Sequence, residues 1–346
     1  MVLYFLIIFF IISPFFPTTR NPHWFFRTAD FIRLQSLLIQ LILLGLLFYF
    51  EEEFTTFSWI LAAALLGSAL YQFVKVFPYS FLYPRRKPKE NSDGHVSILA
   101  GNVLQTNDCY SKFIDEVNRF SPDLVLVMES NKAWENGLAS LEKDYPVTVK
   151  VPLENFYGMH LYSKKKLQNV EVKYQIEDDK PSIFFDYYTH NNSPIFFCCL
   201  HPAPPSPSEN ETSKERDAEL MVTGKTIRNI NKPTVVCGDM NDVVWSRTTR
   251  LFKKMTGMID PRVGRGFFST FHANYFFLRF PLDHLFHTRD LYVGEMVRSK
   301  NFGSDHFAMY YEIHHKRKVE TPKNPKLNGD EKEEVDELVE EGKQNT

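Results

Sequence analysis

Residues 54–74 form a long run without a single charge, FTTFSWILAAALLGSALYQFV. As an α-helix, a run of this length is about as long as the hydrocarbon core of a bilayer is thick. Two more uncharged runs precede it, at residues 34–50 and at residues 1–19, where Pro14 and Pro17 interrupt the pattern. The first run lacks the basic start and the small-residue cleavage site of a signal peptide. We therefore predict a membrane region over residues 1–80 with about three transmembrane helices; the alternative is a buried helical hairpin of a soluble protein.

The charges between these runs predict an orientation. Arg20, Arg27 and Arg33 lie around the first connection, three glutamates fill the second, and basic residues dominate positions 75–89. Because Lys and Arg concentrate on the cytoplasmic side, the pattern predicts an integral membrane protein with its N-terminus outside. The rest of the chain would then be cytoplasmic. Residues 81–94 read as a basic, proline-containing linker.

Residues 95–315 have the pattern of an α/β domain. Strand-like runs occur at 96–104, 124–128, 157–163, 183–188, 195–200, 234–237, 283–287 and 306–313, and helical patterns at 111–120, 132–143, 209–230 and 246–255. This mixture predicts two sheets packed face to face with helices outside. Cys198 and Cys199 are adjacent in one strand and should point to opposite faces as buried free thiols. Residues 316–346 are charged and poor in large apolar residues, which predicts a disordered acidic tail.

The strongest chemical signal lies in residues 234–242, TVVCGDMND. An apolar run delivers Gly238, Asp239 and Asn241 to a strand end. On an extended segment the side chains of Asp239 and Asn241 would point to the same side. Gly238 would allow another group to approach the backbone closely. Gly-Asp-x-Asn is also a good turn sequence, so these residues alone have only moderate specificity.

Other polar residues also lie at the ends of strand-like runs. They are Asn102, Glu129, His201, Asp283 and the pair Asp305 and His306. Taken singly, each has an ordinary explanation as a turn residue, a solvated strand end or a surface imidazole. Together they supply hard oxygen ligands for Mg²⁺ and imidazoles with carboxylate partners for proton transfer and phosphate stabilisation. The ordered set therefore predicts a metal-dependent phosphodiesterase.

In this order, the same segments resemble the endonuclease/exonuclease/phosphatase superfamily, which includes exonuclease-III-like enzymes, deoxyribonucleases and sphingomyelinases. The resemblance covers about residues 96–313. It implies a four-layer α/β sandwich, two packed mixed sheets flanked by helices, here preceded by the transmembrane helices. The arrangement of three spans ahead of such a domain is similar to that of bacterial membrane-anchored members of the family. This similarity implies that the protein lies in a bacterial inner membrane.

The resemblance also implies roles for the residues. Mg²⁺, replaceable by Mn²⁺, would be held by Glu129 with Asn102 and Asp305. Asp239 would deprotonate the attacking water, Asn241 would align it, and His306 supported by Asp283 would stabilise the transition state. His201 would protonate the leaving group or bind a phosphate oxygen, although the two histidines could exchange roles. Asn102, Asn241 and Arg216 are the candidate substrate-binding residues, and for Arg216 a surface role is the simpler reading.

The substrate is left open by the sequence. The net charge of −2 gives no global basic field to attract nucleic acid, and clear DNA-gripping loops are lacking. The leading expectation is a nuclease-like phosphoesterase acting on nucleic acid or another phosphoester. One alternative is a phospholipid or sphingolipid head-group phosphodiesterase, and another is an inactive module that binds phosphorylated ligands or acts as a membrane scaffold. Besides substrate, the bilayer is the one predicted partner, and no protein partner is predicted.

Overall fold

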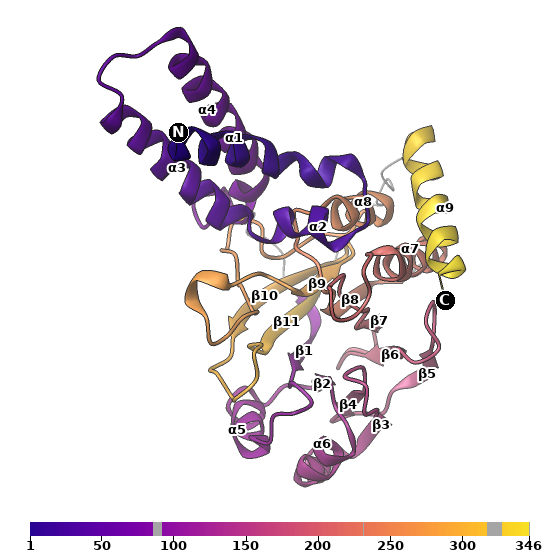
Figure 1. Ribbon diagram of the computed structural model, residues 1–346. Helices are drawn as coiled ribbons and strands as arrows, with labels where there is room; N and C mark the ends of the chain where they lie inside the picture. The colour runs from indigo at the N-terminus through magenta and orange to yellow at the C-terminus, as the bar shows by residue number, and fades with distance from the viewer. Residues whose placement is uncertain (86–91, 231, 317–326, 346) are drawn as a thin grey trace.

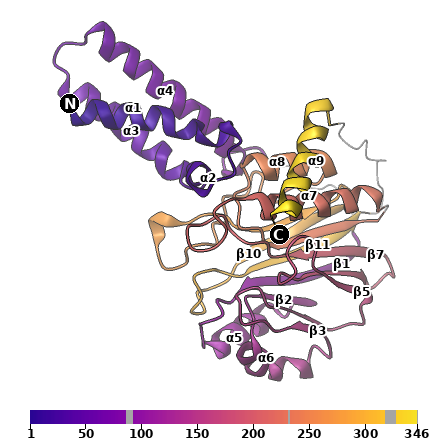
Figure 2. The same ribbon diagram turned by 45° about the vertical axis from the view of Figure 1, so that its right-hand side comes forward.

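The computed structural model describes residues 1–85, 92–230, 232–316 and 327–345 and shows a helical arm that projects from an α/β sandwich (Figures 1 and 2). The arm contains α1 (Val2–Ile12), η1 (Ser13–Thr19), α2 (Trp24–Phe31), α3 (Arg33–Phe50), α4 (Thr56–Val76) and η2 (Phe77–Tyr79). Three stretches of it, Val2–Thr19, Arg33–Phe50 and Thr56–Tyr79, are long and apolar enough to cross a membrane. The basic part of the expected linker, residues 86–91, lies outside the described residues.

Polar side chains hold the arm together from inside. Gln72 donates through Nε2 to Oε1 of Gln40 at 2.6 Å, and Gln40 donates to Oγ of Ser68 at 2.9 Å. All three side chains are buried between helices. In an apolar bundle, such hydrogen bonds between polar side chains fix which faces of the helices pack against each other.

Two mixed sheets form the centre of the sandwich. The first has the strand order β10-β11-β1-β2-β4-β3 and the second β5-β6-β7-β8-β9. The first sheet consists of β1 (Ser92–Asn102), β2 (Leu124–Met128), β3 (Val147–Val151), β4 (Met159–Ser163), β10 (Leu291–Arg298) and β11 (Met309–Lys316). The second consists of β5 (Gln168–Lys173), β6 (Ser182–Tyr188), β7 (Pro194–Leu200), β8 (Thr234–Asp239) and β9 (Asp283–His287). Within each sheet one pair is parallel, β1 with β2 and β7 with β8, so these strands end at the same edge.

Helices cover the outer face of each sheet. The first is covered by α5 (Tyr110–Phe120), α6 (Lys132–Gly137) and η3 (Ala139–Lys143), and the second by α7 (Lys214–Asn229), α8 (Arg247–Thr256) and α9 (Gly329–Gln344). A short η4 (Phe276–Leu278) lies in the loop before β9. The main core lies between the sheets and includes Cys199, whereas Cys198 packs under the outer helices. This arrangement confirms the four-layer sandwich and the opposite orientation of the two adjacent cysteines.

The expectation of a disordered tail is wrong for residues 327–345. Helix α9 starts with a capping box, in which Asn328 and Glu331 satisfy each other's backbone N–H groups. Val335 and Val339 are buried on the same face of α9, and they share an apolar cluster with Leu220 and Met221 of α7. Leu327 and Leu338 join the same cluster, and Glu334 of α9 pairs with Arg247 of α8, so α7 and α8 hold the helix on the sandwich. Residues 317–326 and 346 lie outside the described residues.

We expect Val335→Asp to lower the free energy of unfolding by about 2–4 kcal/mol, because it buries a carboxylate without a partner in this cluster. Thermal unfolding of the full-length protein in detergent measures the change. Glu337→Ala, on the exposed side of the same helix, is the matched control. Equal melting temperatures for the two variants would mean that α9 is not packed on the sandwich in solution.

Candidate active site

Residues from both sheets meet at one end of the sandwich. Asn102 ends β1, Glu129 follows β2, and Asp239 ends β8 of the other sheet. Asn102 donates through Nδ2 to Oε1 of Glu129 at 2.7 Å and to Oδ2 of Asp239 at 3.1 Å. The amide therefore joins the carboxylates of the two sheets, which the sequence placed at strand ends but could not bring together.

Asp239 is completely buried, and its backbone is held tightly against the neighbouring strands. Its N–H donates to the sulfur of Met128 at 3.1 Å. Gly238 before it has φ of 137°, and a Cβ there would lie 2.0 Å from the carbonyl oxygen of Leu200, so only glycine fits. Burial raises the pKa of the Asp239 carboxyl above its usual value.

His306 lies between two carboxylates. Its Nδ1 is 2.9 Å from Oδ2 of Asp283, and its Nε2 is 3.5 Å from Oδ2 of Asp239. Burial alone would lower the pKa of His306, but the charges of Asp239 and Asp283 outweigh it and raise the pKa to about 10. The imidazole is therefore positively charged at neutral pH. The ring of Phe271 covers it, with a centroid distance of 4.9 Å.

Asn241 lies in a turn and not on an extended segment. Its φ is 48°, in the left-handed region, so the expected alternation of side chains beyond Asp239 does not apply. The Asn241 N–H donates to Oδ1 of Asp239 at 3.0 Å, and its Nδ2 donates to the carbonyl oxygen of Pro202 at 2.9 Å. The turn thus fixes Asn241 next to Asp239 and to the segment that carries His201.

His201 is a neutral imidazole. Burial lowers its pKa to about 4. Its Nδ1 has no hydrogen-bond partner among the described residues, and the ring of Tyr157 lies 5.2 Å away. A buried ring nitrogen without a partner is costly unless a ligand or water satisfies it, so His201 is suited to bind a polar group of a substrate.

A row of carboxylates gives the site an excess of negative charge. Asp305 follows Ser304, whose Oγ donates to the carbonyl oxygen of Asn102 at 2.9 Å. Burial raises the pKa of Glu129 to about 7. Ligand atoms of Asp239, Asp283 and His306 lie within 4.8 Å of one another, but a protonated His306 cannot coordinate a metal. Glu129 and Asp305, with the amide of Asn102, are therefore the better match for a divalent cation, which would offset the buried negative charge.

A cavity of about 390 Å³ opens over these residues. Glu129, His201, Asn241, Asp305 and His306 face it. The rest of its lining consists of Phe31, Leu104, Phe156, Tyr157, Pro204, Pro205, Ser206, Ser208, Glu209, Phe271, Phe280 and Leu282. Phe31 belongs to the helical arm and the others to separate loops, so no local sequence pattern could have identified this wall.

Arg216 does not face the cavity, and the expected surface position is also wrong. It is buried on α7, donates through Nε and NH2 to Oδ1 of Asp217, and donates through NH1 to the carbonyl oxygen of Asn241 at 2.8 Å. Asp217 in turn accepts a bond from Arg27 of α2 at 2.8 Å. Arg216 therefore supports the turn that carries Asn241 instead of contacting a substrate, and the same chain of bonds reaches the arm.

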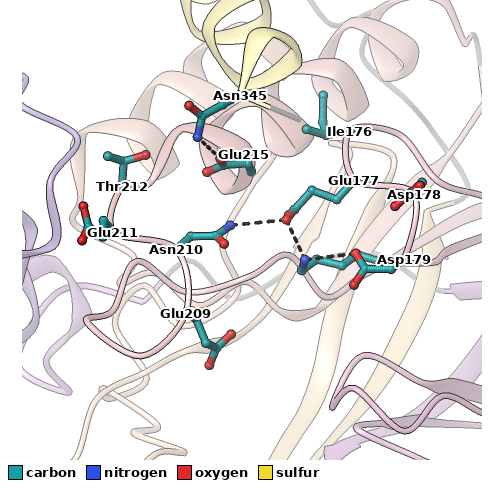
Figure 3. A pocket seen from close by; sticks show the side chains of 11 residues that line it. Ile176, Glu177, Asp178, Asp179, Glu209, Asn210, Glu211, Thr212, Glu215 and Asn345 are labelled. Carbon is teal, nitrogen blue, oxygen red and sulfur yellow. Dashed lines mark hydrogen bonds and ion pairs between the residues drawn. The ribbon is translucent and has the colours of Figure 1, made fainter.

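A larger cavity of about 740 Å³ lies beside α7 and is shown in Figure 3. The acidic residues that line it are Glu177, Asp178, Asp179, Glu209, Glu211 and Glu215. The basic residue in this lining, Lys180, is already paired with Glu177 and Asp179. None of the strand-end residues Asn102, Glu129, Asp239 and His306 lines this acidic cavity, so the candidate site is the smaller cavity.

Comparison with known proteins identifies the fold. The model of the Endonuclease/Exonuclease/phosphatase family matches residues 93–306. The search of curated proteins gave no match.

Three solved structures illustrate the similarity. D. rerio TDP2 in complex with a single-strand DNA product has a TM-score of 0.54 at 14% identity, covering 64% of this chain and 100% of that chain. The catalytic domain of human Nocturnin with bound sulfate has a TM-score of 0.52 at 14% identity, covering 65% of this chain and 95% of that chain. An endonuclease/exonuclease/phosphatase from Bacteroides vulgatus has a TM-score of 0.53 at 15% identity, covering 64% of this chain and 99% of that chain. At these identities the structures show the fold alone, but the family model spans most of the sandwich, and the chain therefore belongs to the endonuclease/exonuclease/phosphatase family.

Proposed function

We propose that the protein is a membrane-anchored hydrolase of phosphodiester bonds that depends on a divalent metal, Mg²⁺ or Mn²⁺. The family implies metal-dependent phosphoesterase or nuclease-type activity. The observation that supports it most is the meeting of Asp239, the charged His306 and Glu129 at one edge of two sheets. The inactive module is disfavoured because every expected acid, base and metal position lies in this one site.

Each residue of the site has a separate role in the proposed reaction. A metal held by Glu129 and Asp305 with Asn102 would supply a Lewis acid for a phosphoryl oxygen and the leaving oxygen. Asp239 accepts the proton of the attacking water, and the turn at Asn241 keeps that water next to it. His306 remains charged and offsets the negative charge that develops on phosphorus.

The pKa values support one assignment of the two histidines. His306, with its pKa raised to about 10 by the nearby carboxylates, fits a fixed positive charge. His201, with its pKa lowered to about 4 by burial, fits a neutral hydrogen-bonding group for a phosphate oxygen. We therefore propose that His201 binds the substrate and does not act as the proton donor.

The test is hydrolysis of bis-p-nitrophenyl phosphate by the full-length protein in detergent. We expect activity with Mg²⁺ and its loss with EDTA. Glu129→Gln should raise the Mg²⁺ concentration for half-maximal activity by about tenfold or more, because a ligand carboxylate is replaced by a neutral amide. Glu171→Gln on the exposed strand β5 is the matched control. Activity that survives EDTA, or an unchanged Mg²⁺ requirement in Glu129→Gln, would contradict the proposed metal site.

A buried ion pair supports the placement of α2 and the sandwich on the same side of the membrane. The first connection of the arm is bonded to α7 through Arg27 and Asp217, so both lie at the same end of the spans. We propose that this side is the cytoplasm of a bacterial inner-membrane protein, as the charge bias favours. A cysteine introduced at Glu171 should then be labelled by an impermeant maleimide only after the membrane is opened. Labelling in intact cells would reverse the orientation.

A further inference from the structure

We propose that the substrate of this site is a bilayer lipid with a phosphodiester head group, which enters the cavity past an exposed aromatic loop next to the arm. The aromatic loop consists of Tyr275, Phe276, Phe277 and Leu278. This inference rests on the proposed function, and it selects the substrate class. In the reaction, water adds to phosphorus and one P–O ester bond breaks. Asp239 releases the proton of the attacking water to solvent and the displaced oxygen takes up a proton from solvent, so the lipid yields an alcohol and a phosphomonoester.

The aromatic loop exposes four consecutive large side chains. Tyr275 is 60% exposed, Phe276 73%, Phe277 75% and Leu278 52%. Four consecutive large side chains form a contiguous patch, and such patches mark contact with a protein or a membrane. The membrane is the occupant we propose, because the loop lies beside a helix that is long and apolar enough to cross it.

The position of the loop relative to the arm supports this assignment. Gln35, in the first turn of α3, donates through Nε2 to the carbonyl oxygen of Phe277 at 2.6 Å. Both views place the loop that carries η4 on the side of the sandwich from which the arm rises (Figures 1 and 2). The first turn of a span lies at the boundary between head groups and hydrocarbon, where aromatic side chains are enriched. Phe25 of α2 is also exposed, at 49%, near the same end of the arm.

A series of rings leads from Tyr275 of this loop through His272 and Phe271 to His306. The ring centroid of His272 lies 4.5 Å from that of Tyr275 and 4.9 Å from that of Phe271. Phe271 and Phe280 pair across the base of the loop. Phe280 contacts Phe31 of α2 edge to face, with centroids 6.0 Å apart, and Phe271 covers His306 at 4.9 Å. All three phenylalanines line the cavity. One wall of the site is therefore apolar from the bilayer side to the reacting centre.

The charges of the cavity distinguish a lipid from a nucleic acid. The described residues that line it include the carboxylates of Glu129, Glu209 and Asp305 but no Lys or Arg. A nucleic acid brings several phosphates, and proteins bind them with several cations. A lipid phosphodiester brings one phosphate, which His306 and a metal can neutralise, and apolar atoms that suit the ring-lined wall. The volume, about 390 Å³, is that of a small-molecule pocket.

The experiment compares membrane lipids, a water-soluble probe and a single-stranded oligonucleotide as substrates of the full-length protein. The protein is reconstituted with Mg²⁺ in vesicles of phosphatidylcholine, phosphatidylethanolamine, phosphatidylglycerol and sphingomyelin, and lipid loss is followed by mass spectrometry. Bis-p-nitrophenyl phosphate is hydrolysed in parallel as the water-soluble probe. We expect at least one lipid to be hydrolysed. The double variant Phe276→Ser, Phe277→Ser should lower the ratio of lipid to soluble-probe hydrolysis by at least about tenfold.

Tyr174→Ser is the matched control, since Tyr174 is an exposed aromatic next to β5, on the far side of the sandwich in Figure 1. Its ratio should equal that of the unchanged protein. Hydrolysis of the soluble probe without any lipid loss would overturn the inference and leave the proposed function in place. Preferential cleavage of a single-stranded oligonucleotide, or an unchanged ratio in the double variant, would also overturn it. If neither the probe nor a lipid is hydrolysed, the proposed function fails and the inference fails with it.

Discussion

Asp239→Asn should reduce metal-dependent hydrolysis of bis-p-nitrophenyl phosphate by about 10³-fold, within the range that a general base contributes. The amide has the same shape as the carboxylate, so the packing around it is kept, but it cannot accept a proton from water. The change also removes one of the two carboxylates beside His306, at 3.5 Å. The loss should appear in kcat at saturating substrate and not only in kcat/KM, because the group acts on the reacting water.

The control for this prediction is Asp115→Asn, an exposed aspartate on α5. It should leave kcat unchanged. Both carboxylate oxygens of Asp239 accept a hydrogen bond, one from the Asn102 amide and one from the Asn241 N–H, so the NH2 group of Asp239→Asn must face a donor. The thermal unfolding temperature should therefore fall, and kcat is compared well below it. A variant that keeps more than a tenth of the activity would exclude Asp239 as the proton acceptor.

Asp283→Asn should shift the alkaline limb of the pH–rate profile to lower pH by at least about one unit. An opposite charge within 4–6 Å raises the pKa of a histidine by about this much or more, and Oδ2 of Asp283 lies 2.9 Å from Nδ1 of His306. A raised pKa keeps His306 charged below about pH 10, so removing Asp283 makes the charge disappear at lower pH. The variant should therefore lose most activity near pH 9 and least near pH 6.

His306→Gln completes this test, because it removes the positive charge at every pH. We expect activity to fall about 10³-fold, an effect of the size found when a preorganised electrostatic group is lost. The alkaline limb due to His306 should vanish at the same time. An Asp283→Asn profile that is lower at all pH values without a shift would mean that Asp283 orients the ring and does not tune its pKa.

The strand ends of the site could be predicted from sequence because each is a local pattern. Asn102, Glu129 and Asp239 follow runs of apolar residues, and a buried strand followed by a polar residue is visible within about ten positions. The parallel pairing that brings Asn102 and Glu129 to one edge follows from the alternation of strands and helices, whereas Asp239 comes from the other sheet. The 2.7 Å and 3.1 Å bonds of Asn102 depend on how the two sheets pack, which no local pattern encodes.

The elements that were missed are strands at the edges of the sheets and one helix, α9, whose partner α7 lies far away in sequence. Strand β5 is exposed along its whole length at a sheet edge, so it has no apolar alternation to detect. Strand β3, at the edge of the other sheet, is only half-buried. Helix α9 carries few apolar residues, and these form an apolar cluster only together with residues of α7 and α8. Arg216 was read as a surface residue because arginine is seldom buried, and its partners Asp217 and the Asn241 carbonyl explain the exception.

The bonds from Arg27 to Asp217, and from Arg216 to Asn241, make the arm and the sandwich one cooperative unit. Without α2, Asp217 would keep only one of its two guanidinium partners while remaining buried, and part of that cost would reach the turn next to Asp239. The boundary between the arm and the sandwich along the chain is therefore not a boundary between two independently stable units. An exchange of this arm for another helical segment would succeed only if the new segment brought a cation to Asp217.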